Sequence, residues 1–318
     1  MTIIKSFSVG NGDMFAIRHD SDNFTIIDCH LIRNVQEKVL GDIAIMKKGK
    51  TISRFISTHP DKDHIRGLST LDERFKILNF YCVKNEATKE KDNDEFDYYQ
   101  SLRDSDKVFH IYKGCGRRWM NRSDEERDSA GIDILWPDVS NTFFEDALEI
   151  AKDGGDPNNI SPIILLKAHG YKFLWMGDLE TGFMENIADE LELPKVDVLF
   201  APHHGRESGH IPKELLESLD PEVIVIGEAP SENLSYKYSN FATTITQKTA
   251  GDITFEVDEY GVDIYVSEEN YSTDILNKDS GEKEEAEDSV YQDWIGECNL
   301  DGYLILRMRK TGEKTFLL

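Results

Sequence analysis

The stretch that decides the fold reads Ser-Thr-His-Pro-Asp-Lys-Asp-His-Ile-Arg-Gly-Leu, from residue 57 to residue 68. Four potential metal ligands, His59, Asp61, Asp63 and His64, directly follow an apolar run that predicts a strand. Because a loop that leaves a strand can direct alternate side chains at one point, these groups can converge. Two imidazoles and two carboxylates would repel or desolvate one another unless a cation lay between them. The stretch therefore favours a metal site over the alternative, a polar turn in which Asp63 and His64 cap the next helix.

The order of motifs along the chain resembles the metallo-β-lactamase superfamily. The pattern His-x-Asp-x-Asp-His at 59–64 is similar to its His-x-His-x-Asp-His signature, with Asp61 in place of the second histidine. Asp28, Asp178 and the Pro-His-His-Gly loop at 202–205 follow strand-like runs and match the remaining landmarks in the expected order. The resemblance implies an α/β (α+β) fold of the αββα type, in which two sheets pack face to face with helices outside.

A narrower resemblance is to the hydrolase domain of ComEC-type competence proteins. It rests on the opening Phe-Ser-Val-Gly-Asn-Gly-Asp-Met-Phe at 7–15, on Asn-Asn-Ile-Ser at 158–161, on Met-Gly-Asp178 and on the Asp61 variant. ComEC-type proteins carry this domain beside membrane helices. The apolar runs of this chain are strand-length, far short of the about 20 residues that a membrane span needs. We therefore expect no membrane segment.

The composition divides the chain into three parts. We predict a hydrolase domain over residues 1–267, with an insertion at about 84–130 that is charged and poor in β-branched residues. Residues 268–293 hold ten acidic and two basic residues and are predicted to form an acidic linker. Residues 294–318 are expected to form a C-terminal hairpin that docks on the body or on a partner.

Strand-like runs fall into two groups. The first group is expected to extend to about residue 136, and the second begins near residue 161. Asn11-Gly12 and His169-Gly170 lie between neighbouring strand-like runs, where hairpin turns are expected. Two strand-rich halves interleaved with helices fit the αββα sandwich.

Charge and cysteine usage indicate a cytoplasmic protein with an acidic surface. The four cysteines of the 318 residues are scattered without a Cys-x-x-Cys pair, which suits reduced thiols in a cytoplasm. The net charge is −25, and removing the −8 of residues 268–293 leaves −17. Such acidity argues against an extended phosphate-binding surface. The one basic concentration, at 113–122, places two arginines beside a tryptophan and suits phosphate or base contacts, although a merely basic loop is the alternative.

The superfamily resemblance implies a site for two divalent metal ions. Its expected ligands are His59, Asp61, Asp63, His64, Asp178 and His204. The first two residues would hold one ion, the next two the other, and Asp178 would bridge them.

Further roles follow from the same resemblance. Asp63 would also orient the metal-activated water, His203 would donate to a phosphoryl oxygen or leaving group, and Asp28 would orient the 59–64 loop. The expected substrate-binding residues are Asn158, Asn159, Ser161, Arg117 and Arg118.

Two departures from the superfamily pattern bear on the metal. Most members have a third-motif histidine where this chain offers Asn158 or Asn159, although turn chemistry after Gly-Gly-Asp-Pro is the alternative reading of that pair. Together with Asp61, an amide oxygen would make the first site rich in oxygen. Such a site favours Mn²⁺ or Mg²⁺, with Zn²⁺ as a further candidate because it also accepts carboxylates.

These inferences lead to one functional hypothesis and two alternatives. The first is a metal-dependent phosphodiesterase or nuclease that cleaves DNA. The second is a hydrolase of a small phosphodiester or ester, which accommodates the acidity better. The third is a partner-dependent effector of a multi-protein bacterial defence system, to which the acidic linker and C-terminal hairpin point. The sequence predicts no oligomeric state.

Overall fold

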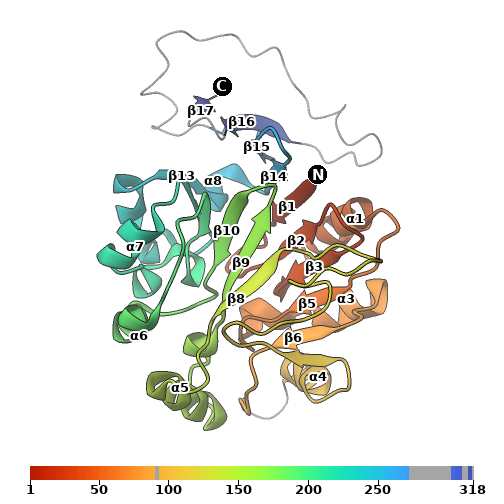
Figure 1. Ribbon diagram of the computed structural model, residues 1–318, viewed down its shortest axis with the longest axis vertical. Coiled ribbons are helices and arrows are strands. Elements are labelled where there is room, and N and C mark those ends of the chain that lie inside the picture. Colours follow the sequence, from red (N-terminus) through yellow and green to blue (C-terminus); the bar gives the residue numbers. More distant parts are fainter. Residues whose placement is uncertain (90–92, 272–301, 310–313, 317–318) are drawn as a thin grey trace.

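The chain forms two β-sheets that pack face to face, with helices on their outer sides (Figure 1). The computed structural model describes residues 1–89, 93–271, 302–309 and 314–316. Helices α1 (Gln36–Lys47), α3 (Leu68–Phe75) and α4 (Asp94–Arg103) flank the first sheet, and α6 (Thr181–Ile187) and α7 (Lys213–Leu219) flank the second. This is the predicted αββα sandwich.

The first sheet has the order β17-β16-β15-β14-β1-β2-β3-β5-β6-β7. Strands β3, β5, β6 and β7 are parallel, and every other neighbouring pair in this sheet is antiparallel. Its strands are β1 (Thr2–Ser6), β2 (Phe15–Arg18), β3 (Phe24–Ile27), β5 (Arg54–Ile56), β6 (Phe80–Cys82), β7 (Val108–His110), β14 (Ile253–Val257), β15 (Val262–Val266), β16 (Tyr303–Met308) and β17 (Lys314–Phe316).

The second sheet has the order β13-β12-β11-β10-β9-β8. Strands β10 to β13 are parallel, whereas β8 and β9 join the sheet in antiparallel fashion. Its strands are β8 (Ile132–Trp136), β9 (Ile163–Ala168), β10 (Tyr171–Trp175), β11 (Val198–Phe200), β12 (Val223–Ile226) and β13 (Thr243–Thr246).

The remaining elements are, apart from α5, short. They are β4 (Cys29–His30), α2 (Lys62–Ile65), α5 (Thr142–Lys152), α8 (Gln247–Ala250) and the 3₁₀ turns η1 (Asn158–Ile160), η2 (Ala188–Glu190), η3 (His203–Gly205), η4 (Glu207–Gly209), η5 (Ser231–Asn233) and η6 (Tyr236–Asn240). None of the helices in the described ranges is long and apolar enough to cross a membrane. Cys29, Cys82 and Cys115 are buried free thiols, and Cys298 lies outside those ranges.

The two sheets do not correspond to the two halves of the sequence. Strand β8 belongs to the second sheet, so the change of sheet comes before residue 136. Strands β14 and β15 return to the first sheet, where β14 pairs with β1. The physical reason is that β1 has an open edge, which a strand from the far end of the chain fills.

The two predicted hairpin turns behave differently. His169 and Gly170 both have positive φ, 49° and 86°, and form the two-residue connection between β9 and β10. Asn11-Gly12 instead lies within the longer loop 7–14 between β1 and β2. That longer loop reaches the site described below.

The C-terminal strands extend the first sheet. β16 pairs with β15 on one side and with β17 on the other, both in antiparallel fashion. The predicted acidic linker lies outside the described residues from position 272 onward. The division at residue 267 stays a prediction.

An aromatic cluster holds the sheets together beneath one edge of the sandwich. The rings of Trp175 and Phe200 stack with centroids 4.5 Å apart, and Phe15 from the opposite sheet meets Phe200 edge-on at 5.0 Å. Each such pair contributes about 0.5–1.5 kcal/mol beyond its burial. The cluster fixes the carboxyl ends of β10 and β11 relative to β2, and it is from those ends that polar loops emerge.

Candidate metal centre

Polar residues from four strand ends meet at one edge of the sandwich. Asp28 follows β3 and the 57–64 segment follows β5, which is parallel to β3. Asp178 follows β10 and His203-His204 follows β11, which is parallel to β10. Because parallel neighbours end at the same edge of a sheet, the two sheets bring these loops together.

Three buried histidines each have one ring nitrogen fixed by a neighbour. His64 Nδ1 donates to Asp28 Oδ2 at 2.8 Å, and His204 Nδ1 donates to Asp13 Oδ1 at 3.0 Å. His59 Nδ1 lies 3.0 Å from the hydroxyl of its neighbour Thr58 and 3.2 Å from that of Ser161. Such contacts fix the tautomer and orientation of an imidazole so that its Nε2 is presented elsewhere.

The three Nε2 atoms converge on one carboxylate. Oδ2 of Asp178 lies 3.2 Å from Nε2 of His64, 3.5 Å from that of His204 and 3.9 Å from that of His59. These four residues are at most 2% exposed. The three Nε2 atoms and Asp178 Oδ1 have no hydrogen-bond partner. Buried polar groups are rarely left unpaired, and here the unpaired atoms are the atoms that bind divalent ions in proteins.

The donor set therefore fits a divalent metal ion. One ligand atom each from Asp13, His64, Asp178 and His204 lies within 4.8 Å of the other three. Imidazole nitrogens and carboxylate oxygens suit zinc, manganese and iron alike. The chain thus has a candidate metal-binding group at this edge of the sandwich, and the ligand types alone do not select the metal.

Sequence reasoning missed Asp13. Its carboxylate is brought to His204 by the loop 7–14, whose backbone is tied to the ligand loop by a hydrogen bond of 3.1 Å from Asp13 N to Asp63 O. A Cβ atom at Gly12 would lie 2.2 Å from His30 Nδ1 and 2.7 Å from the carbonyl oxygen of Asp63. Only glycine permits this close approach. The signal available in the sequence was the Gly-Asn-Gly-Asp turn, which supported the family resemblance but suggested no role for Asp13.

Strained backbone accompanies these residues. Asp28, His203 and His204 have φ of 56°, 53° and 56°, in the left-handed region that non-glycine residues avoid. Gly177 has φ of 52°, and a Cβ atom there would lie 2.6 Å from the side chain of Ser161. Such conformations cost of order 1–3 kcal/mol each and persist where the surroundings over-determine them, commonly at functional sites.

The two carboxylates of the ligand loop lie differently. Asp63 Oδ2 is 3.4 Å from His204 Nε2. Burial would raise the pKa of Asp63, but His204 and the nearby His64 hold that pKa below its usual range. Asp61 points to Lys89, whose Nζ lies 2.5 Å from Asp61 Oδ1. The pKa of Asp61 is raised, chiefly by burial. An ammonium thus lies where the sequence analysis expected the first metal.

Replacement of Lys89 by methionine should therefore strengthen Mn²⁺ binding. The lysine neutralises Asp61 and would repel a cation beside it. Because the pair is about a quarter exposed, with side chains 23% and 29% accessible, the gain should be at most about fivefold in affinity. Calorimetric titration of both proteins checks this, with Lys62→Met, which removes an exposed ammonium next to Asp61 in the chain, as the control. Unchanged or weaker binding by Lys89→Met would contradict the expectation.

Metal binding should also strengthen as the pH rises. Burial alone would lower the pKa of His204, but Asp178 and Asp13 raise it to about 10, and Asp178 and Asp28 likewise raise the pKa of the buried His64. A histidine with a raised folded-state pKa stabilises the ion-free fold below its ordinary value of 6.5, and that contribution is lost as the pH approaches about 10. An ion must displace these protons, so affinity should rise about tenfold per pH unit for each proton released.

Calorimetry between pH 6 and 8 in buffers of different ionisation enthalpy counts those protons. We expect at least one proton to be released for each Mn²⁺ bound. Affinity independent of pH, with no proton release, would mean that the ion binds elsewhere.

His203 plays a different part from the one predicted. Its Nε2 lies 3.9 Å from Asp178 and accepts a hydrogen bond from Arg206 Nη1 at 3.2 Å, while its Nδ1 lies 3.0 Å from the hydroxyl of Ser208. Burial lowers the pKa of His203. A neutral ring that accepts from Arg206 is not the donor that the sequence analysis expected. Arg206 is the hydrogen-bond donor here.

The 158–161 segment supports the site from behind. Asn159 bonds to Glu180 twice, through its amide nitrogen to the carboxylate at 2.9 Å and through its oxygen to the backbone N–H at 3.0 Å. Ser161 is fully buried, and its hydroxyl accepts from Asp178 N at 3.2 Å in addition to its contact with His59. These bonds differ from the expected substrate contacts, because Asn159 is bonded to Glu180 and Ser161 to two residues of the site. Asn158 is buried and its backbone N–H bonds to Asp156.

Arg117 and Arg118 do not lie beside the histidines. They line a cavity at the amino ends of β3, β5 and β6, whereas the histidines lie at the carboxyl ends of such strands. The physical reason is the path of the loop after β7, which returns past the start of β5, where Trp119 O accepts from Arg54 Nη2. Their expected substrate role at the metal centre is therefore not supported by their position.

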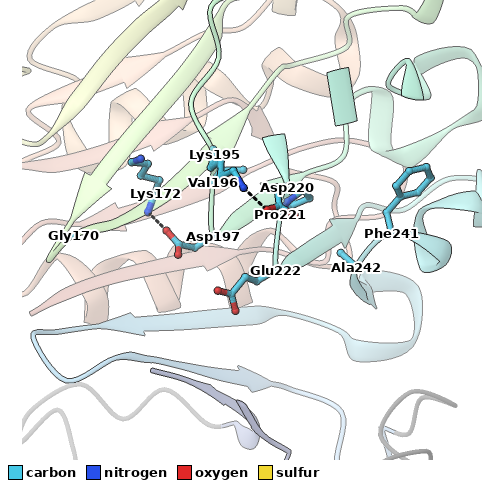
Figure 2. Close-up of a pocket in the computed structure, with 10 residues that line it drawn as sticks. All are labelled: Gly170, Lys172, Lys195, Val196, Asp197, Asp220, Pro221, Glu222, Phe241 and Ala242. Atoms are coloured by element: carbon cyan, nitrogen blue, oxygen red, sulfur yellow. Dashed lines mark hydrogen bonds and ion pairs between the residues drawn. The ribbon is translucent and has the colours of Figure 1, made fainter. Parts of the chain in front are cut away.

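A second large cavity also lies away from the centre. It has a volume of about 590 Å³ and lies at the amino ends of β10, β11 and β12. Figure 2 shows the residues that line it. Lys195 pairs with Asp220 at 2.7 Å, and Asp197 accepts from the backbone N–H of Lys172 at 2.7 Å. Among the unpaired buried atoms of the metal centre, those of Asp178 and His204 lie beyond the opposite, carboxyl ends of β10 and β11.

Comparison with known proteins gives one sequence relative. No family model matches the chain. ComE operon protein 3 of Bacillus subtilis (strain 168) is 25% identical over 190 residues, which are 60% of this chain and 22% of that protein. The chain thus spans about a fifth of the length of that relative. This similarity agrees with the ComEC-type resemblance inferred from the motifs.

Solved structures of metallo-β-lactamase-fold proteins are also similar. Igni18, described as a metallo hydrolase from Ignicoccus hospitalis, is 15% identical with a TM-score of 0.47 over 80% of this chain and 100% of that one. CmlA, a diiron β-hydroxylase from Streptomyces venezuelae, is 13% identical with a TM-score of 0.46, and the match covers 80% of this chain and 54% of CmlA. The metallo-β-lactamase SMB-1 is 10% identical with a TM-score of 0.37, and the match covers 63% of this chain and 79% of SMB-1.

Proposed function

We propose that this αββα protein is a metal-dependent phosphodiesterase that cleaves DNA. The observation that carries the proposal is the convergence of three unpaired imidazole nitrogens on buried Asp178, which suits a divalent ion. The choice of DNA rests on the resemblance of the motifs to ComEC-type competence proteins, with which the sequence similarity to ComE operon protein 3 of Bacillus subtilis agrees. The choice of a phosphodiester over other substrates rests on Arg206, whose guanidinium is a hydrogen-bond donor next to His203.

Two ion positions would fit around Asp178. His64, His204 and Asp63 would hold one ion and His59 would contribute to the other, with Asp178 shared by both. Asp61 would join the second position by giving up its ion pair with Lys89. When bound, divalent ions polarise a phosphoryl oxygen and lower the pKa of water. The carboxylates of Asp61 and Asp63 favour Mn²⁺ or Mg²⁺, since oxygen ligands suit hard ions.

The protein's own groups supply orientation. Asp63 keeps 28% of its side chain exposed while His204 fixes one oxygen, so its carboxylate can accept a hydrogen bond from an attacking water. Asp28 accepts from Thr58 N at 2.8 Å, from Thr58 Oγ1 at 2.7 Å and from His64, and thereby holds the start and the end of the ligand loop. Preorganised groups of this kind need no rearrangement during reaction.

Arg206 is the group best placed to bind a phosphate. Its guanidinium donates to His203 Nε2 and, at 2.5 Å, to Asn11 Oδ1, and its Nε has no partner. Within the described ranges no carboxylate forms an ion pair with it. Guanidinium groups bind phosphate oxygens through charge-assisted hydrogen bonds. Because the chain carries −25 charges, contacts confined to this site are favoured over an extended basic groove.

The test is cleavage of single- and double-stranded DNA in the presence of Mn²⁺. Wild type should cleave at least one of them, and Asp63→Ala and Asp178→Ala should not. A parallel series with bis(p-nitrophenyl) phosphate tests the second candidate, a small-phosphodiester hydrolase, which the net charge of −25 favours. Cleavage of neither substrate, or equal cleavage by wild type and variants, would overturn the proposal.

Arg206→Gln should reduce kcat/KM on phosphodiesters by about 10- to 100-fold. This range corresponds to the about 1.5–3 kcal/mol of a hydrogen bond to a charged group. Arg74→Gln, at an exposed position of α3, is the matched control. Metal affinity should stay unchanged in both proteins, and equal kcat/KM for wild type and Arg206→Gln would remove Arg206 from the site.

A further inference from the structure

The cavity lined by Arg117 and Arg118 lies against the first sheet, at the end opposite the metal centre. It has a volume of about 550 Å³ and lies at the amino ends of β3, β5 and β6. Its lining is unusually basic for so acidic a chain. The lining residues that matter below are Arg54, Asn79, Tyr81, Arg117, Arg118 and Arg127.

Arg54 is a buried cation without an anion. It is 2% exposed, donates to Thr25 Oγ1 and to Trp119 O at 3.0 Å each, and leaves its Nε without a partner. Among the residues that the structure describes, no carboxylate pairs with it. Its guanidinium lies 5.3 Å from the centre of the Tyr81 ring. An uncompensated buried charge is costly, and a bound anion would offset that cost.

Arg117 brings a second guanidinium to the same cavity. It stacks 4.6 Å from the centre of the Phe109 ring and 5.8 Å from that of Tyr81, and it donates to Asn79 Oδ1 at 3.1 Å. It too lacks a carboxylate partner within the described ranges. Both guanidinium groups therefore lie within 6 Å of the centre of one ring, that of Tyr81, although their like charges repel.

The other arginines of the cavity behave differently. Arg118 pairs with Asp124 and, at 3.3 Å, with Glu126, while Arg127 lies 3.9 Å from Asp22. In a chain with 61 acidic and 36 basic residues, acidic partners are plentiful. That Arg54 and Arg117 have none, and that both face one cavity, indicates a site that an external anion completes.

We propose that this cavity binds a phosphate monoester. Two guanidinium groups match the double negative charge of that group, and their planar donors bind phosphate oxygens in pairs. The volume lies within the range of small-molecule sites, about 300–1,000 Å³. A free nucleotide and the phosphorylated end of a nucleic-acid strand carry the same group. The site is separate from the metal centre and does not depend on the proposed function.

Arg54 also has a structural role, because it ties the loop around Trp119 to β5. A substitution of Arg54 would therefore disturb the fold as well as the proposed anion site. Arg117 is half-buried, and the hydrogen bond described for its side chain is the one to Asn79, so Arg117→Gln is the informative variant. Arg122→Gln removes the same charge from the same loop at an exposed position outside the lining, and serves as the control.

The experiment is calorimetric titration of the full chain in EDTA, so that no phosphate binds through metal. The probes are inorganic phosphate, adenosine 5′-monophosphate, adenosine, and a hexanucleotide with and without a 5′-phosphate. We expect the phosphorylated probes to bind wild type and Arg122→Gln equally, and Arg117→Gln at least about tenfold more weakly. Preference for the mononucleotide or for the 5′-phosphorylated strand identifies the source. Absence of binding by all phosphorylated probes, or equal affinity of Arg117→Gln and wild type, would overturn the proposal.

Discussion

Asp178→Asn should lower phosphodiester hydrolysis by at least about a thousandfold, the several kcal/mol that metal ions contribute to a charged transition state. The reason lies in its central position. A single oxygen of Asp178 is within 3.9 Å of the Nε2 atoms of His59, His64 and His204, so no other carboxylate can replace it. Asparagine keeps the shape of the side chain but removes its charge. Mn²⁺ affinity should fall together with activity.

The matched control for this variant is Asp146→Asn, which makes the same change on the exposed face of α5. It should retain wild-type hydrolysis and wild-type Mn²⁺ affinity. Circular dichroism of both variants establishes that the fold is kept. If Asp178→Asn is folded and retains a tenth or more of the wild-type rate, Asp178 is not central to the reaction.

Asp13→Ala should weaken Mn²⁺ binding by about 10- to 100-fold, as the loss of a partner that orients a metal-binding histidine commonly does. Asp13 accepts the Nδ1–H of His204 at 3.0 Å and is one of the groups that could hold an ion. Without it, His204 loses the contact that aims its Nε2 at Asp178. Isothermal titration with Mn²⁺ measures the effect.

A second variant separates the two roles of Asp13. Asparagine can still accept the hydrogen bond from His204, but it carries no charge for an ion. If Asp13 only orients the ring, Asp13→Asn should bind Mn²⁺ nearly as well as wild type. If Asp13 is itself a ligand, Asp13→Asn should be as weak as Asp13→Ala. Wild-type affinity in Asp13→Ala would exclude both roles.

The sequence could predict those parts of the site that are local. His59 and His64 lie five residues apart on one loop after a strand, and their convergence follows from that spacing. Asp178 and His204 could be assigned only because the order of motifs resembles a known superfamily. The structure adds the reason for their position, since β10 and β11 are parallel neighbours.

Features that depend on distant contacts could not be predicted. The pairing of β1 with β14 joins strands about 250 residues apart and has no local signal. Asp13 reaches His204 only because the β1–β2 loop folds over the edge of both sheets. The basic segment containing Arg117 was recognised, but its location was not, because the loop after β7 returns to the amino end of β5. The contact of Lys89 with Asp61 could not be predicted either, because Lys89 belongs to the charged segment that was predicted as an insertion.

One short segment shows how backbone geometry changed a predicted role. The sequence alone suggested that His203 donates to substrate. In the structure two consecutive residues with positive φ, His203 and His204, turn the chain so that Arg206 reaches back to His203 Nε2. The ring accepts a hydrogen bond, and Arg206 is the donor of this pair.

The most direct test of the account is the anomalous diffraction of crystals grown with Mn²⁺. The account predicts a strong anomalous peak bounded by Nε2 of His64, Nε2 of His204 and the carboxylate of Asp178, absent from Asp178→Asn crystals grown in the same way. A well-ordered crystal with no peak among these residues, or with its only peaks elsewhere, would contradict the central claim that this cluster is a metal centre.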